Sequence, residues 1–312
     1  MLNVTIRQLR VFAAVARHLS FSRAAEELHL TAPAVSMQIK DLEDTVGLPL
    51  FDRGAKRIGL TISGEYFLLH ARRMLASLKD AEDMIARLRG VTAGRLTIGM
   101  LSTAKYFVPR LLAGFLRDHP GVEVRLVAGN RQQLVELLQR NEVDLAIMGR
   151  PPKELDTRAE PFALHPLAVV AAPEHPLAAL PHVPAQLISS EAFIIREPGS
   201  GTRNAMEIYF REQRISPPVI MEMTSNETIK QAVIANMGLS FLSLHTVSLE
   251  LKTGLLRVLE LDGLPLLRRW HVVHLHARML SPAAEAFRYH VLENGEAFLA
   301  QHFSHDHAVQ AG

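Results

Sequence analysis

The sequence predicts a chain of three parts: a small all-α N-terminal unit that ends in a hairpin, a long linker helix, and a larger α/β part with two lobes. Three observations lead to this prediction. Three short helical patterns fill the first 47 residues, an apolar repeat continues from residue 67 to residue 88, and strands alternate with helices beyond residue 94. At 312 residues, the chain also exceeds the usual domain size of roughly 100 to 200 residues.

The composition is that of an ordinary folded protein. Hydrophobic residues make up 48% and charged residues 21%, which excludes a disordered chain. Cysteine is absent, so disulfides, thiolate metal sites and cysteine nucleophiles are excluded, and a cytoplasmic location is expected. We find no export signal and no apolar run of roughly 20 residues, and therefore expect no membrane partner. The net charge is only +2, which does not by itself indicate a nucleic-acid partner.

Three short helices are predicted before residue 47. Thr5, Ser20 and Thr31 each precede an apolar stretch of helical period, where a hydroxyl can cap the first turn. Pro33 is acceptable in the first turn of the third helix, and Gly47 provides its end. The leading end of this third helix carries no acidic residue.

A basic hairpin is predicted after the third helix. Residues 48–61 have the pattern of two short strands around a turn, with Arg53, Lys56 and Arg57 at the tip. Three helices followed by such a wing match a winged helix-turn-helix, whose third helix enters the DNA major groove while the wing contacts phosphates. The alternative is a winged helix used only for protein contacts.

The third helix has a face that suits DNA. Met37 and Lys40 point away from the predicted buried stripe, Lys40 can donate to phosphates or base edges, and Met37 suits a thymine methyl group. The residues predicted to contact double-stranded promoter DNA are Ser20, Ser22, Arg23, Thr31, Ala32, Pro33, Ser36, Met37, Gln38, Lys40, Arg53, Lys56 and Arg57.

The long helix that begins at Ser63 carries a coiled-coil pattern. Its apolar residues alternate spacings of four and three, at Phe67, Ala71, Met74, Leu78, Ala81, Ile85 and Leu88. A period of 3.5 predicts pairing with a second copy of the chain rather than packing on the protein's own core. The alternative is a single amphipathic helix on a globular surface.

Beyond residue 94, two runs of strands and helices predict two α/β lobes with parallel strands. The predicted strands are 95–100, 122–127, 144–148, 167–172, 192–195, 219–223, 239–242 and 270–276, and the helices are 109–117, 131–139, 203–211, 227–236 and 282–299. The expected domains are 1–62, a linker at 63–90, and 91–302 with lobe I at about 91–162 and 268–302 and lobe II at about 163–267, followed by a flexible tail at 303–312.

The N-terminal motifs resemble the signature of LysR-type transcription regulators. They are FSRAAEEL at 21–28, TAPAVSMQI at 31–39, LE at 42–43, GLPLFDR at 47–53 and LT at 60–61. The resemblance extends over essentially the whole chain and implies a DNA-binding regulator with a periplasmic-binding-protein-like effector domain. It also implies a dimer through the linker helix, a dimer of dimers on an interrupted palindrome, and contact with RNA polymerase.

Three further features are similar to the branch that regulates carbon-fixation (Calvin-cycle) operons. They are STAKYFVP at 102–109, Met37, and DLAIMGRPP at 144–152. One position departs from the family, because Ala32 stands where many relatives have glutamine. This change removes a bidentate reader of adenine, so the preferred DNA site is expected to be relaxed or shifted at one position.

The resemblance implies an effector bound between the lobes, and polar residues follow the predicted strands, where open α/β sheets bind ligands. The residues expected to contact it are Ser102, Thr103, Lys105, Asn130, Arg150, Thr202, Arg203 and Asn226. Helix N-termini with nearby basic side chains favour an anion. By the resemblance, it is a phosphorylated or carboxylated intermediate of carbon metabolism, and no cofactor is expected. For each residue the alternative is an ordinary helix cap or a solvated loop.

Other functions stay open. The chain could be a LysR-type regulator of another metabolic operon, or a solute-binding or catalytic α/β protein with an accessory helical domain. We find no linear catalytic signature and expect no enzyme activity, and residues 199–202 lack the Gly-Lys that completes a nucleotide P-loop. His271, His274 and His276 share a predicted strand, but no cysteine or neighbouring carboxylate assists them, so no metal is expected.

Overall fold

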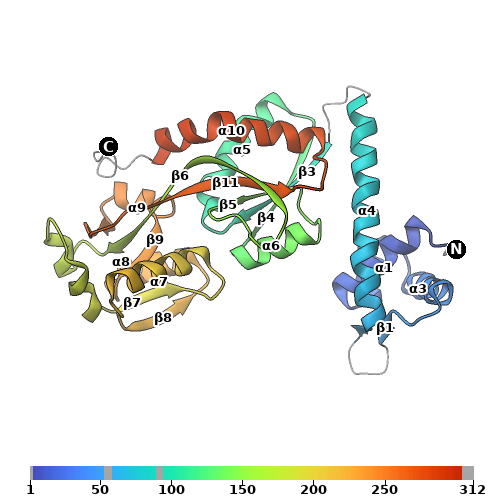
Figure 1. Cartoon of the computed structure of the whole chain (residues 1–312), viewed down its shortest axis with the longest axis horizontal. Helices are drawn as coiled ribbons and strands as arrows, with labels where there is room; N and C mark the ends of the chain where they lie inside the picture. The colour runs from blue at the N-terminus through green and yellow to red at the C-terminus, as the bar shows by residue number, and fades with distance from the viewer. Residues whose placement is uncertain (1–2, 53–57, 89–93, 304–312) are drawn as a thin grey trace. The chain divides into compact units, whose positions relative to one another are not determined.

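The computed structural model describes residues 3–52, 58–88 and 94–303, with the backbone alone at 79–80 and 83–88. The chain forms two compact units, Met1–Arg89 and Gly90–Gly312. Figure 1 draws the first in blue to cyan and the second in green to red. Among the helices in these ranges, none has the length and apolar character needed to cross a membrane.

The N-terminal unit contains the predicted helices and hairpin. Its elements are α1 (Ile6–His18), α2 (Phe21–Glu27), α3 (Ala32–Val46), β1 (Phe51–Asp52), β2 (Gly59–Leu60) and the long α4 (Ile62–Leu88), and β1 pairs antiparallel with β2. The hydroxyls of Thr5, Ser20 and Thr31 accept hydrogen bonds from the backbone N–H three residues ahead, as the capping pattern predicts. Gly47 ends α3 at φ 77°, a conformation that suits glycine.

The first turns of α4 belong to the core of this unit. The Phe67 ring lies 5.2 Å from the Phe12 ring, and Ala71 is fully buried in the same cluster. The prediction that these two residues face a second copy is therefore wrong, because a 3.5 period cannot be separated from 3.6 over so few turns. Further along α4, Met74 is 48% exposed and Ala81 is exposed. Met74 and Ala81 of the apolar stripe are therefore not covered by their own unit.

The second unit alternates strands and helices. Its strands are β3 (Gly94–Leu101), β4 (Val122–Gly129), β5 (Leu145–Met148), β6 (Thr157–Ala171), β7 (Phe193–Arg196), β8 (Val219–Met223), β9 (Ser240–Ser243), β10 (Arg257–Val258) and β11 (Leu266–Leu275). Its helices are α5 (Val108–Asp118), α6 (Arg131–Gln139), α7 (Gly201–Gln213), α8 (Asn226–Ile234), α9 (Ser248–Lys252) and α10 (Pro282–Phe303), with short 3-10 helices at Ala104–Tyr106, Pro176–Ala179 and Ala185–Ser190.

The main sheet is mixed rather than parallel. Its strand order is β10-β6-β11-β5-β3-β4, and β9 also pairs with β6. The strand β3 is parallel to β4 and β5, whereas β11 runs antiparallel to both β5 and β6. A separate two-stranded parallel sheet joins β7 and β8. The prediction of parallel strands is thus correct for β3, β4 and β5 and for β7 and β8, and wrong for β6, β9 and β11, which pair antiparallel.

The long strand β6 explains this difference. It begins ten residues before the predicted strand at 167, and its added part contains Pro161 and Pro166. Proline removes a ladder hydrogen bond, so a sequence with two prolines argues against a strand. Here both prolines face β11, opposite His271 and Leu267. The antiparallel pairing of β6 with β11 could therefore not be predicted from the sequence pattern.

The two long strands contribute to more than one core. Phe162 on β6 packs with Trp270 on β11 in one hydrophobic cluster, and Leu167 and Val169 of β6 pack in a second cluster. Figure 1 shows α5 and α10 on one side of the sheet and α6 on the other. The residues that directly follow β3, β4 and β5 lie next to the N-terminal end of α7.

Candidate functional site

The outer face of α3 is the exposed part of the N-terminal unit that resembles a DNA-reading surface. Val35, Ile39 and Leu42 are fully buried, and they hold the helix against α1 and α2. On the opposite face Met37 is 61% exposed and Lys40 is exposed. A large apolar side chain that is so exposed contributes little to folding, so the Met37 and Lys40 side chains are free to contact a partner.

The other residues predicted to contact DNA lie in different settings. Ser22, Arg23 and Pro33 are exposed, and Ala32 and Ser36 are half-buried. The hydroxyls of Ser20 and Thr31 are engaged as helix caps, whereas the side-chain oxygen of Gln38 is buried and has no partner among the described residues. The predicted wing residues Arg53, Lys56 and Arg57 lie outside the described residues.

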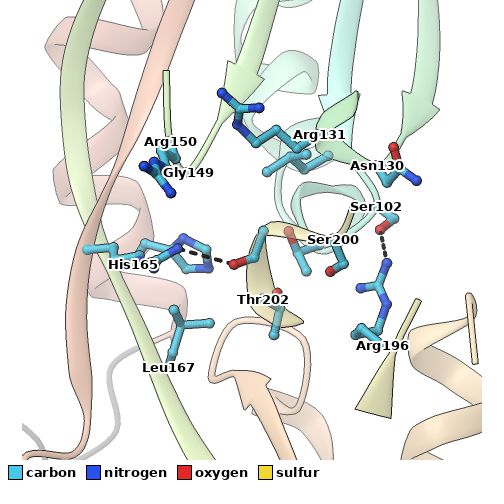
Figure 2. A pocket seen from close by; sticks show the side chains of 14 residues that line it. Ser102, Asn130, Arg131, Gly149, Arg150, His165, Leu167, Arg196, Ser200 and Thr202 are labelled. Atoms are coloured by element: carbon cyan, nitrogen blue, oxygen red, sulfur yellow. Dashed lines mark hydrogen bonds between the residues drawn. The ribbon is translucent and has the colours of Figure 1, made fainter. Parts of the chain in front are cut away.

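A pocket lies in the second unit, where the ends of several strands meet. The ends of β3, β4, β5 and β7, the strands β6 and β11, and the start of α7 line it (Figure 2). The lining residues are Leu101, Ser102, Thr103, Asn130, Arg131, Gly149, Arg150, His165, Leu167, Arg196, Ser200, Gly201, Thr202 and Arg268. Four of them are arginines and none is a carboxylate, so the pocket is electropositive.

Five of the predicted effector residues meet in this pocket: Ser102, Thr103, Asn130, Arg150 and Thr202. They come from three strand ends and one helix start, because parallel strands bring their carboxyl ends to one edge of the sheet.

The other three predicted residues are engaged elsewhere. Lys105 Nζ lies 3.8 Å from a Glu227 carboxylate oxygen, and Arg203 forms ion pairs with Glu207 and Glu222. Arg203 lines a second cavity next to the pocket. Asn226 is buried as the first residue of α8, whose cap is Ser225, and it does not line the pocket.

Arg196 connects the two sides of the pocket. Its guanidinium is 3% exposed and donates to both carboxylate oxygens of Glu197, at 2.7 and 2.9 Å, and to Asn226 Oδ1 at 2.6 Å. It also donates to Ser102 Oγ at 3.1 Å (Figure 2). Because Glu197 balances its charge, Arg196 holds Ser102 in place rather than supplying a free positive charge.

The remaining arginines differ in how their charge is balanced. Arg131 makes two hydrogen bonds to Glu154, at 2.9 and 3.1 Å. Arg150 donates to Asn204, and Arg268 donates to the Gly201 carbonyl, and neither forms an ion pair with a described carboxylate. Burial and the nearby charge of Arg150 lower the pKa of Arg268. Two neighbouring cations without a carboxylate partner favour a bound anion.

Two family models match the chain. "Bacterial regulatory helix-turn-helix protein, lysR family" matches residues 6–65, and "LysR substrate binding domain" matches residues 89–296. This chain belongs to the LysR family. It is therefore a DNA-binding transcription regulator with an N-terminal helix-turn-helix and a two-lobed α/β substrate-binding domain.

Similar proteins match this LysR-family chain over most of its length. It is 51% identical over 300 residues to the "HTH-type transcriptional regulator CfxR" of Cupriavidus necator, covering 96% of this chain and 95% of that protein. It is 47% identical over 291 residues to a "RuBisCO operon transcriptional regulator" of Allochromatium vinosum, covering 93% and 96%. The regulatory domain of Synechocystis PCC6803 CcmR in complex with 2-PG matches with TM-score 0.62 and 42% identity, covering 64% of this chain and 96% of that one.

Five polar pocket residues of the LysR-family chain were not among the predicted effector contacts: Arg131, His165, Arg196, Ser200 and Arg268. Arg196 ends β7 much as Arg150 follows β5, so the same rule about strand ends could have found it. Arg131 is the first residue of α6 and could have been found beside Asn130. His165 and Arg268 lie within β6 and β11, in parts of the strands that the prediction missed.

Proposed function

We propose that this LysR-family protein regulates carbon-fixation genes in response to a small anionic metabolite. The observation that carries the proposal is the pair Arg150 and Arg268, which face the pocket with no carboxylate partner among the described residues. A phosphate or carboxylate group would balance these charges and could accept from Ser102, Thr103 or Thr202. The regulatory domain of CcmR, with 42% identity, has a solved structure in complex with 2-PG, and a relative with 47% identity is named for the RuBisCO operon, which supports this class of effector and target.

The proposed regulator has no catalytic role and acts in the cytoplasm on promoter DNA, with RNA polymerase as a further partner. The domain boundaries expected from the sequence, including lobe I at about 91–162 and 268–302 and lobe II at about 163–267, are part of the proposal. The effector changes the closure of the two lobes. In the assembled protein, this change alters the placement of paired DNA-binding units and the bend of the promoter.

Genome-wide footprinting with and without 2-PG tests the proposal. We expect protected sites upstream of carbon-fixation genes, and we expect 2-PG to change the footprint length or DNA bend at those sites. Protection at unrelated operons would point instead to control of another metabolic pathway. Footprints that are identical with and without 2-PG would contradict a response to this effector, and turnover of 2-PG with no protected sites would favour a catalytic α/β protein.

The exposed face of α3 provides a second test, because Met37 and Lys40 are proposed to act differently on DNA. Lys40→Ala should weaken binding to all DNA sequences and reduce the slope of log affinity against log salt by about one, as expected for a lost phosphate contact. Met37→Ala should change the preferred base at one position instead. Fluorescence anisotropy with a set of single-base operator variants measures both effects, and equal behaviour of the two variants would contradict this division.

We also propose that the exposed part of the α4 stripe, from Met74 onward, pairs with a second copy, and that two dimers assemble into a tetramer. The support is the exposure of Met74 and Ala81, which lie seven residues apart on one stripe of the helix with the half-buried Leu78 between them. Two DNA-binding units on one dimer suit an interrupted palindrome, in which half-sites lie on one face of the duplex.

A further inference from the structure

His165 is a buried histidine in the wall of the effector pocket. It lies on β6, is 4% exposed, and contributes to the pocket lining (Figure 2). Neither ring nitrogen has a hydrogen-bond partner among the described residues. Buried polar groups are nearly always paired, so a fully unpaired imidazole in a pocket wall points to a partner that arrives from outside.

The ring is held rigidly in this position. It stacks on the Trp270 ring at a centroid distance of 3.9 Å and an angle of 19°. A Cβ atom at Gly149 would lie 2.8 Å from His165 Nδ1, so only glycine leaves space for the ring there. The imidazole is therefore preorganised, and a ligand that meets it loses little free energy in ordering the side chain.

The charged surroundings of His165 are positive before a ligand binds. Arg268 is its direct cross-strand neighbour on β11, Arg150 lines the same pocket, and the His245 ring lies 6.0 Å away. His245 Nδ1 accepts a hydrogen bond from the indole N–H of Trp270. No described carboxylate lines the pocket. Burial, His245 and Arg268 together lower the pKa of His165 well below its usual value, so the free protein holds this ring neutral at neutral pH.

We propose that His165 contacts the anionic effector and takes up a proton when the effector binds. The inference rests on the anionic effector proposed above. The proton comes from the solvent and joins the unprotonated ring nitrogen, so the imidazolium then has an N–H for the anion and offsets part of its charge. An anion within about 4 to 6 Å stabilises the charged ring, which raises its pKa in the complex relative to the free protein.

The sign of the pH dependence follows from this difference. The stabilisation by the imidazolium is complete at a pH below the pKa of the free protein and is lost as the pH rises through the higher pKa of the complex. Affinity should then fall with rising pH by up to about tenfold per pH unit. A phosphate group on the effector, with a second pKa near about 6, would by itself produce the opposite trend, because its dianion becomes more abundant.

Isothermal titration calorimetry of the full chain with 2-PG between about pH 5.5 and pH 8 tests the proposal. At each pH, two buffers of different ionisation enthalpy report the protons taken up. The wild type should bind more weakly as the pH rises and take up as much as about one proton per site. His165→Gln and His165→Phe should both lose this uptake and this trend, and Phe keeps the stacking on Trp270. His274→Gln is the matched control, since His274 is buried outside the pocket and should leave both quantities as in the wild type.

The outcomes separate the two proposals. If 2-PG binds and the His165 variants keep the proton uptake and pH slope of the wild type, the role of His165 is overturned while the effector site stands. If 2-PG does not bind the wild type at any pH, the proposed effector class and the role of His165 both fall.

Discussion

Replacing Met74 and Leu78 with glutamate should turn the assembled protein into a monomer and weaken operator binding by roughly a hundredfold or more. In the isolated chain Met74 is 48% exposed and Leu78 is half-buried, so the change should not disturb the core of the N-terminal unit. In a paired helix, however, the same positions would bury like charges at the seam. The loss in DNA affinity arises because one monomer can engage only one half-site.

Multi-angle light scattering and gel-shift titration with a full operator measure these two effects. Arg73→Glu is the control, because Arg73 is exposed on the other side of α4 and its change leaves the stripe intact. Binding of the double variant to a single half-site should stay close to that of the wild type. An unchanged oligomer in the double variant would contradict pairing through α4, and loss of half-site binding would show that the DNA-binding unit itself is damaged.

The second large effect is expected for Arg268→Gln in the effector pocket. Removing a charged donor to an anion costs about 1.5 to 3 kcal/mol, or roughly ten- to hundredfold in Kd for 2-PG. Arg268 has no described carboxylate partner, and the positive charge of Arg150 opposes its own, so the fold should not depend on this charge. Calorimetric titration measures the Kd, and thermal unfolding without 2-PG reports on the fold.

Arg269→Gln is the matched control for that experiment. It changes the adjacent residue of the same strand, whose side chain points to the other face of the sheet and is exposed. Its Kd for 2-PG should equal that of the wild type. If both variants bind 2-PG as well as the wild type does, the anion site does not include Arg268.

The helical parts of the fold could be predicted because their signals are local. A hydroxyl cap, a proline in the first turn and a terminal glycine act within one turn of the backbone, so α1, α2 and α3 could be read from neighbouring residues. The stripe on α4 is different. Whether Phe67 meets a second copy or Phe12 depends on where α1 lies, and periodicity does not contain that information.

Some residues of the effector pocket could likewise be predicted from the sequence, and others could not. Residues at strand ends could be predicted because parallel strands place their carboxyl ends together, which brought Ser102, Asn130 and Arg150 to one pocket. His165 and Arg268 meet through antiparallel pairing of β6 with β11, two segments about one hundred residues apart in sequence. Pro161 and Pro166 argue against a strand in the first part of β6, so the local sequence did not predict it. Pairing between strands so far apart in sequence depends on tertiary packing rather than on local sequence preference.

By itself, the amino-acid sequence determined the helix-turn-helix, the family motifs and a positively charged site at the strand ends, since each depends on neighbouring residues or on a repeated unit. Only the tertiary structure decided which face of α4 is covered by its own unit, that the sheet is mixed, and that an imidazole with no hydrogen-bond partner among the described residues shares the pocket with two arginines. Those features arise from contacts between distant segments, whose free energy depends on the complete packing of the chain.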